Sequence, residues 1–275
     1  MPSVAYYFSG TGNNLATAKE LSTYIPDMEI RPITQLLHDK IIPEQFDLVG
    51  FILPAYYGHI PPLAADCLSG LQFSKHQRVF SIIACAGMRG YSIEDIRKLL
   101  SASGKAVQYE FMLVYPDNGI LVHGPYAPWQ QKLLLSFTKS RIKKIASQLK
   151  KPDGSKVLKK SLLYSQKIET SFQQSISEFS SRGLAFIVSE DCIHCGSCVK
   201  VCPAGNVRMQ NNTVTFGPNC QQCMACIQWC PAKAIDYKGL AKERQRYRHP
   251  DITIGEMIEY NGVTQNDTAP DQSKE

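Results

Sequence analysis

The chain has 275 residues, a length that favours about two domains. It is 44% hydrophobic and 20% charged, ordinary values for a globular protein with a sizeable core, so a wholly disordered, collagen-like or small disulfide-stapled chain is excluded. The net charge of +6 is too mild to identify a partner. Because there is no run of 18 apolar residues and no signal-peptide pattern at the N-terminus, we expect a cytoplasmic protein without a membrane partner.

Residues 1–150 alternate short apolar runs with helical segments. The apolar runs, typical of strands buried on both faces, are 4–8, 48–53, 79–84 and 107–114. Helical signals cover 13–24, 62–70 and 92–100, and apolar residues at 129, 133, 137, 142, 145 and 149 predict an amphipathic helix that ends near Lys150. Alternating strands and helices predict an α/β domain with a doubly wound parallel sheet.

A loop rich in glycine and hydroxyl groups follows the first predicted strand and leads directly into a helix. It reads Ser9, Gly10, Thr11, Gly12, Asn13, Asn14. Backbone N–H groups at a helix N-terminus, made accessible by glycines, form an anion site. Neither the P-loop lysine nor a G-x-G-x-x-G pattern is present, so nucleotide triphosphate hydrolysis is not supported. A simple glycine turn with an N-cap is the alternative interpretation.

Two further loops follow predicted strands, the positions where open α/β sheets bind ligands. They read Pro54, Ala55, Tyr56, Tyr57, Gly58 in the first and Cys85, Ala86, Gly87 in the second. With the loop at 9–14, they resemble the FMN-binding loops of flavodoxins, although flavodoxins commonly have Thr where this chain has Asn14. The resemblance covers residues 1–150.

This resemblance implies that residues 9–14 contact the FMN phosphate and that Tyr56, in preference to Tyr57, stacks on the isoalloxazine ring. The backbone of residues 85–87 would meet the edge of the ring. Packing at the edge of the sheet is the alternative role for either tyrosine. Cys85 is either a redox thiol or a small buried side chain.

Residues 151–183 form a basic linker between the two halves of the sequence. Apolar residues at 164, 168, 172, 176 and 179 predict a second amphipathic helix that ends at Gly183. From 139 to 170 the chain carries ten basic and two acidic residues. This basic stretch is either a solvated surface or a docking face for an acidic redox partner, such as a ferredoxin or flavodoxin. We expect no nucleic-acid partner, since interleaved aromatic residues are missing.

Eight of the ten cysteines fall between Cys192 and Cys230, which indicates metal or redox chemistry rather than disulfides in a cytosolic chain. They form two copies of C-x2-C-x2-C-x3-C-P, offset by 28 residues. This spacing is that of bacterial ferredoxins, in which the fourth cysteine of each copy ligates the other cluster. The predicted ligands are Cys192, Cys195, Cys198 and Cys230 for one [4Fe–4S] cluster, and Cys202, Cys220, Cys223 and Cys226 for the other. Structural zinc is the alternative.

Residues 184–237 therefore resemble a ferredoxin with two [4Fe–4S] clusters, a small α+β domain. Residues 238–275 are a C-terminal extension, and the composition from Asn261 onward is typical of a disordered tail. Taken together, the two resemblances are those of a flavodoxin–ferredoxin fusion.

This resemblance implies an electron-transfer oxidoreductase that passes single electrons between two [4Fe–4S] clusters and an FMN. One alternative is a flavin enzyme with its own substrate, for which His59, Arg89 or His123 would supply polar groups. Another is an iron–sulfur sensor or binding protein. A Ser-His-Asp set, paired carboxylates and a nicotinamide fingerprint are all missing from the sequence, so we assign no catalytic residue.

Overall fold

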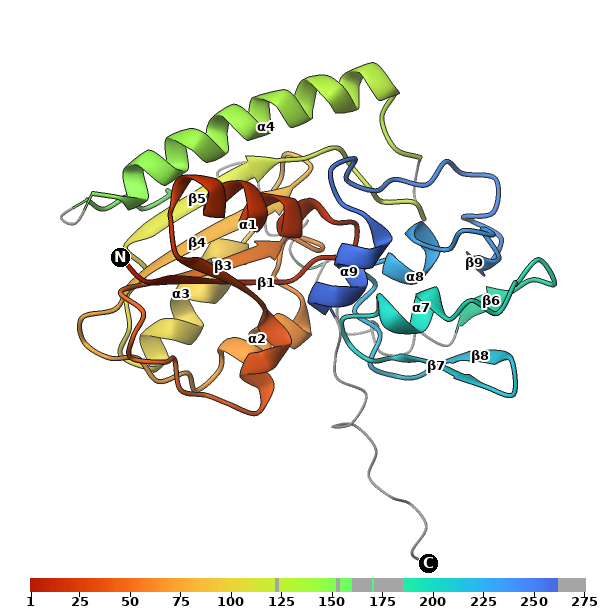
Figure 1. The fold of residues 1–275 in the computed structure, drawn as a ribbon, viewed down its shortest axis with the longest axis horizontal. Coiled ribbons are helices and arrows are strands. Elements are labelled where there is room, and N and C mark those ends of the chain that lie inside the picture. Colours follow the sequence, from red (N-terminus) through yellow and green to blue (C-terminus); the bar gives the residue numbers. More distant parts are fainter. Residues whose placement is uncertain (122–123, 152–153, 160–169, 171–184, 262–275) are drawn as a thin grey trace, which may run out of the picture.

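The computed structural model of the protein describes residues 1–121, 124–151, 154–159, 170 and 185–261. A sheet flanked by helices lies beside a smaller lobe that contains the cysteine block (Figure 1). Among the described helices, none is long and apolar enough to cross a bilayer. The predicted helix around 164–179 lies outside the described residues, as do residues 262–275.

Five parallel strands form the sheet, and the sequence predicted the parallel sheet and four of these strands. They are β1 (Ser3–Tyr7), β2 (Met28–Pro32), β3 (Leu48–Pro54), β4 (Arg78–Cys85) and β5 (Tyr109–Val114). Their order is β2-β1-β3-β4-β5, which is the flavodoxin-like order, with the switch point between β1 and β3. The sequence analysis missed β2, because an edge strand alternates polar and apolar residues and has no continuous apolar run.

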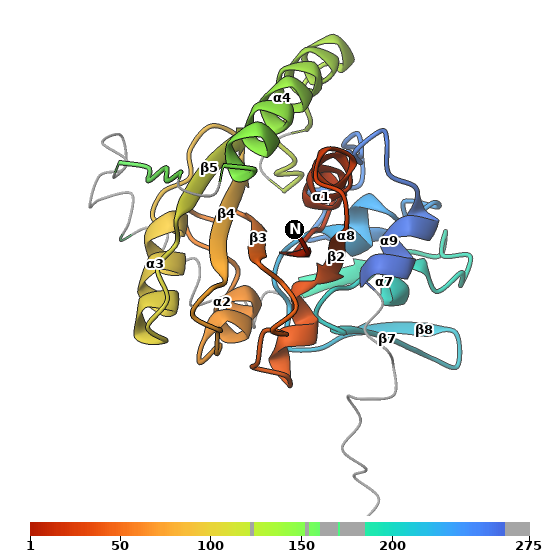
Figure 2. The same cartoon turned by 60° about the vertical axis from the view of Figure 1, so that its left-hand side comes forward.

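Helices cover both faces of the sheet, and each face has its own apolar core (Figure 2). On one face lie α1 (Asn13–Tyr24) and α4 (Pro128–Leu149). On the other lie the 3-10 helix η1 (Ile33–Leu37), α2 (Pro62–Leu68) and α3 (Ser92–Ala102). This doubly wound arrangement confirms the predicted fold class.

Helix α4 departs from the predicted single apolar stripe. Its second half packs on the sheet through Ile142, Ile145 and Leu149, which are buried. Its first half turns Trp129 and Phe137 to solvent, with 68% and 64% of each residue exposed. At 3.6 residues per turn, the two sets of apolar residues lie about 150° apart around the helix. The sequence spacing therefore predicted a single apolar stripe, whereas the two sets of apolar residues lie on opposite faces of the helix.

The second lobe is a small α+β unit. Its elements are β6 (Phe186–Val188), α7 (Ser197–Lys200), β7 (Val207–Gln210), β8 (Thr213–Phe216), α8 (Ala225–Gln228) and β9 (Ile235–Tyr237). Strand β6 pairs antiparallel with β9, and β7 pairs with β8. A stacked Phe186–Phe216 pair, with ring centroids 5.0 Å apart, joins the two ribbons.

The C-terminal extension is part of the core up to residue 261, where we had predicted a tail to begin. Helix α9 (Ile254–Asn261) contacts β2 and α7, and Met257 within it is fully buried. The side-chain amide of Asn261 donates to the carbonyls of Ser9 and Val201, at 3.1 and 3.4 Å. The tail prediction was therefore wrong at Asn261, because its polar side chain is buried and paired with both lobes.

Candidate functional site

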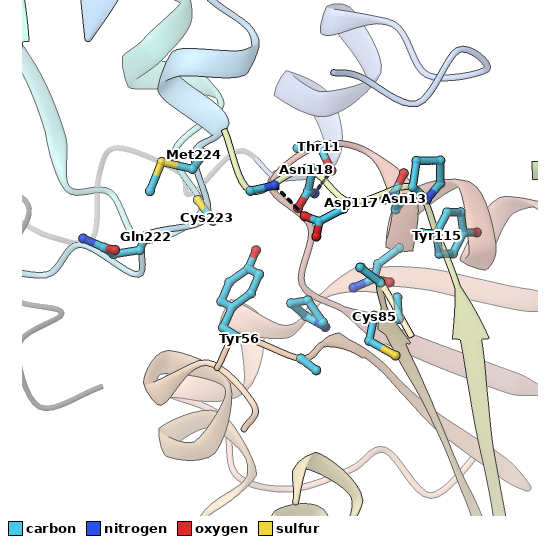
Figure 3. Close-up of a pocket in the computed structure, with 18 of the residues that line it drawn as sticks. Thr11, Asn13, Tyr56, Cys85, Tyr115, Asp117, Asn118, Gln222, Cys223 and Met224 are labelled. Carbon is cyan, nitrogen blue, oxygen red and sulfur yellow. Dashed lines mark hydrogen bonds between the residues drawn. The ribbon is translucent and has the colours of Figure 1, made fainter. Parts of the chain in front are cut away.

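A cavity of about 450 Å³ opens at the carboxyl edge of the sheet, where the loops after β1, β3, β4 and β5 converge (Figure 3). Its volume lies in the usual range for small-molecule sites, and open α/β sheets bind ligands at this edge. The fifth wall is a segment of the cysteine block, residues 222–224. We call this space the sheet cavity.

Twelve of the fourteen residues predicted to bind flavin line the sheet cavity. They are Ser9, Gly10, Thr11, Asn13, Asn14, Pro54, Ala55, Tyr56, Tyr57, Gly58, Cys85 and Ala86. The two exceptions are Gly12 and Gly87. Gly12 turns away, since an added Cβ would lie 3.2 Å from the Cβ atoms of His249 and Ile252. Gly87 has a φ of 115° and no atom near the position of a Cβ.

The loop before α1 is held by its own side chains. The Gly12 N–H donates to the Ser9 hydroxyl at 3.1 Å, and the Asn14 amide donates to the Phe8 carbonyl at 2.7 Å. The side-chain oxygens of Thr11 and Asn13 accept bonds from more distant parts of the chain, which fixes the outer side of the loop.

The start of α1 offers neutral donors to an anion. No described side chain caps this helix, so its first backbone N–H groups are available, and the lining residues include no lysine or arginine. Asn14 Oδ1 is buried and has no hydrogen-bond partner among the described residues, so a ligand hydroxyl would satisfy it. These features fit the phosphate and polar chain of an FMN.

Tyr56 stands in the sheet cavity with its hydroxyl end toward Cys223 (Figure 3). A tight turn presents it, in which the backbones of Tyr56 and His59 exchange hydrogen bonds of 2.8 and 3.0 Å. Burial raises the pKa of the Tyr56 hydroxyl well above its usual value, so the ring stays neutral. The half-buried ring lines the sheet cavity, and its stacking on a flavin stays a prediction.

Cys85 lies at the end of β4 and is buried. Burial raises the pKa of its thiol above the usual value, so the thiol stays protonated. Of the two roles considered for Cys85, packing at the cavity wall therefore agrees better with its surroundings than redox chemistry does.

Two parts of the sheet cavity were missed by the sequence analysis. One is the loop at 115–121, in which Asn118 Nδ2 donates to Thr11 Oγ1 at 2.8 Å and the Asp117 carboxylate accepts from the Gly119 N–H at 2.8 Å. Its Pro-Asp-Asn-Gly turn directly after an apolar run could have indicated it. The other is the segment 222–224. The cysteine spacing predicts that Cys223 is a cluster ligand, but it does not indicate that this segment contacts a sheet more than 100 residues earlier in the chain.

The eight clustered cysteines divide between two small cavities. Cys192, Cys195, Cys198 and Cys230 line the first, and Cys202, Cys220, Cys223 and Cys226 line the second. In each cavity the fourth cysteine comes from the other copy of the repeat, so the structure brings together the two quartets that the sequence predicted. We call these the outer and the inner quartet.

The chemistry of these quartets fits a cluster better than a single ion. Four thiolates around one zinc would lie about 4 Å from one another, at Zn–S bonds of about 2.3 Å. Within the described part of the chain, no three potential ligands are grouped closely enough to hold one metal ion. Backbone N–H groups also point at the sulfurs, from Asn206 to Cys202 at 3.3 Å and from Gln222 to Cys220 at 3.4 Å. Hydrogen bonds to the ligand sulfurs tune the reduction potential of a cluster.

The two quartets differ in their access to solvent. Cys195 of the outer quartet is exposed, and the hydroxyl of Ser197 holds the pKa of its thiol below the usual value. Cys226 of the inner quartet is buried, which raises the pKa of its thiol well above the usual value. The outer quartet therefore reaches the surface at Cys195, whereas no cysteine of the inner quartet is exposed.

The inner quartet is directly attached to the sheet cavity. Cys223 and Met224 line both spaces. The indole N–H of Trp229 donates to the Gly10 carbonyl at 2.9 Å, and both residues are buried. Gly10 is in such close contact with the backbone of Cys223 that a Cβ would lie 2.2 Å from the Cys223 carbonyl oxygen. The loop that would hold a phosphate is thus packed on the loop that would hold a cluster.

A sheet with the flavodoxin-like strand order and a ligand cavity at its switch point is joined to two cysteine quartets that suit iron–sulfur clusters, and this combination is that of a redox protein. Residues 184–231 match the family model described as a 4Fe-4S dicluster domain. No curated protein matches the chain.

Several solved structures resemble the N-terminal half. Flavodoxin 1 from Bacillus cereus is 16% identical, with 52% of this chain and 98% of that chain covered and a TM-score of 0.33. A flavodoxin from the domain Archaea is 13% identical, with 55% and 100% covered and a TM-score of 0.33. An FMN-dependent NADH-azoreductase from Bacillus anthracis is 10% identical, with 55% and 100% covered and a TM-score of 0.38. The fold assignment rests on the strand order and not on these scores.

Proposed function

We propose that this protein is an electron-transfer oxidoreductase that passes single electrons between two [4Fe–4S] clusters and an FMN. The observation that carries the proposal is the position of Cys223, a predicted ligand of the inner cluster that also forms a wall of the sheet cavity. A flavin exchanges one or two electrons with its partners, whereas each cluster exchanges one.

The chain's own residues supply binding and orientation. The start of α1 binds the phosphate, Tyr56 covers the ring, and the two quartets hold the clusters. Cys198 of the outer quartet and Cys226 of the inner quartet belong to the same apolar cluster, and Cys223 of the inner quartet lines the sheet cavity, so the inner quartet adjoins both other sites. This arrangement supports transfer through the inner cluster.

An external one-electron carrier would approach at the outer quartet. Ile193 and Cys195 are exposed there, next to the cavity lined by the quartet. We had expected an acidic ferredoxin or flavodoxin because of the basic stretch at 139–170. No described residue of that stretch lines either cysteine cavity, so the proposed docking point is the outer quartet itself.

A flavin enzyme with its own substrate has less support. His59 pairs with Asp95 at 2.9 Å and Arg89 with Glu94 at 2.7 Å, and neither His59 nor Arg89 lines the sheet cavity. The third candidate, His123, lies outside the described residues.

The first experiment is anaerobic purification with quantification of iron, FMN and zinc. About eight irons and one FMN per chain are expected, from two four-iron clusters. If eight irons are found but no FMN is bound, even after FMN is added, the protein would be an electron carrier or sensor that uses its clusters alone. Zinc in place of iron would remove the redox role of the cysteine block.

The second experiment separates the inner cluster from the outer. The variant Cys202→Ser removes a predicted ligand of the inner cluster, so electrons delivered to the outer cluster by flash photoreduction should no longer reach the FMN. The control Cys67→Ala removes a buried cysteine of α2 that lines neither cysteine cavity, and transfer should persist. Equal transfer rates in both variants would contradict the proposed route.

A further inference from the structure

Helix α4 carries a row of large apolar side chains that nothing in the described structure covers. Trp129, Leu133 and Phe137 follow one another every four residues and are 68%, 49% and 64% exposed. They face away from the sheet, on the side opposite the buried Ile145 and Leu149. Both views show α4 as an outermost element of the molecule (Figure 1 and Figure 2). We call these three residues the α4 row.

The charged residues of α4 itself are all basic. Lys132, Lys139, Arg141, Lys143 and Lys144 belong to α4, which contains no acidic residue. Among the described residues, only Lys139 of this set pairs with a carboxylate, that of Glu20 at 3.5 Å. An exposed helix with tryptophan, leucine and phenylalanine on one side, flanked by lysine and arginine, has the composition of a helix that lies in a membrane interface.

We propose that the α4 row and its basic flanks dock this protein on an anionic lipid surface, with α4 lying in the plane of the headgroups. The apolar side chains would enter the boundary between headgroups and acyl chains, and the lysine stems would extend their ammonium groups toward lipid phosphates. We had expected no membrane partner because the sequence has neither a spanning segment nor a signal-peptide pattern, and a helix lying on the surface requires neither.

The charges and the position of the row argue against two other occupants, a second copy of this chain and an electron-transfer partner. In a dimer formed through two α4 rows, the five cations of one copy would face the five of the other. An electron-transfer partner would gain no access to a cofactor there, because no residue of the row lines the sheet cavity or a cysteine cavity. A lipid surface needs no such access and supplies the negative charge.

The test is co-sedimentation of the purified, cluster-loaded full chain with lipid vesicles. We expect binding to phosphatidylcholine vesicles that contain about one third phosphatidylglycerol, and little binding to phosphatidylcholine alone or at about 0.5 M salt. Replacing all three residues of the row by alanine should weaken binding at least about tenfold, from the loss of buried apolar area. The control Ile41→Ala/Ile187→Ala removes apolar side chains that are 57% and 56% exposed elsewhere, and it should bind normally.

A charge variant tests the basic flanks separately. Each basic side chain near an anionic leaflet is worth about a fivefold gain in partitioning, so Lys132→Gln/Lys143→Gln/Lys144→Gln should bind about 100-fold more weakly. The control Lys98→Gln neutralises an exposed lysine of α3 and should bind like the original chain. Iron and FMN content should be unchanged in every variant, because none of these residues lines a cofactor cavity.

Three results would overturn the proposal. The first is no binding to anionic vesicles, and the second is binding that the alanine variant retains. The third is a complex formed through the α4 row with a second copy or with an acidic ferredoxin, detected by light scattering without vesicle binding. That result would assign the row to a protein interface.

Discussion

Gly10 is packed against Cys223 of the second lobe, so Gly10→Ala tests how the sheet cavity depends on the inner quartet. The added Cβ would lie 2.2 Å from the Cys223 carbonyl oxygen and 3.0 Å from the Cys223 Cβ. The nearest of these atoms belongs to the backbone, so a change of rotamer cannot relieve the clash. One loop has to move away from the other.

The size of the effect follows from this distance. Restoring an ordinary contact requires a displacement of about 1 Å, and overpacking of this kind costs about 1–3 kcal/mol. If the loop at 9–14 moves, the backbone donors at the start of α1 are displaced, and the dissociation constant for FMN should rise about 5- to 150-fold. If the loop at 222–224 moves instead, the inner cluster should be lost first.

The assay measures both outcomes on the same protein. FMN affinity is obtained by titrating the flavin-free protein and following the quenching of FMN fluorescence, and cluster content by iron analysis and absorption under anaerobic conditions. The control Gly255→Ala adds a Cβ in α9 whose nearest neighbour is 3.8 Å away, so it should be neutral or slightly stabilising. Wild-type FMN affinity together with full iron content in Gly10→Ala would refute the tight contact and the coupling derived from it.

Three further predictions concern the stability of the protein. Trp229→Phe removes the 2.9 Å hydrogen bond that the indole N–H donates to the Gly10 carbonyl and should lower the free energy of unfolding by about 1–3 kcal/mol in a denaturant titration. Arg97→Ala leaves Glu110, which is 1% exposed, without its cation and should cost about 3 kcal/mol in the same titration. Burial lowers the pKa of His249 to about 4, so the unfolded chain binds more protons between that value and about 6.5, and stability should fall by about 1.4 kcal/mol on going from pH 8 to pH 5.5.

Matched controls separate these effects from general damage. Arg31→Ala removes a surface partner of Glu29, whose side chain is 48% exposed, and should cost less than about 1 kcal/mol. If Arg97→Ala lowers the free energy of unfolding by no more than Arg31→Ala does, the burial of Glu110 does not make its ion pair more important for stability. His249→Gln should flatten the pH dependence of the free energy of unfolding between pH 8 and pH 5.5. An unchanged slope would show that other groups cause this pH dependence.

The regular spacing of the sequence was enough to predict the fold class and the grouping of the cysteines. Apolar runs indicated four of the five parallel strands, because a strand buried on both faces needs apolar residues throughout. The cysteine spacing predicted that each quartet takes its fourth member from the other copy of the repeat, and the structure places Cys230 and Cys202 accordingly. Both inferences depend on local chain geometry, which a short stretch of sequence specifies.

Contacts between distant segments were decided only by the tertiary structure. The sequence gives no sign that Cys223 would meet Gly10, or that Asn261 would be buried between Ser9 and Val201. The same holds for α4, where the spacing alone could not tell that Phe137 is exposed while Ile142 is buried. Periodicity describes which residues share a face of an element, whereas packing decides what that face meets, because burial depends on atoms supplied by the rest of the chain.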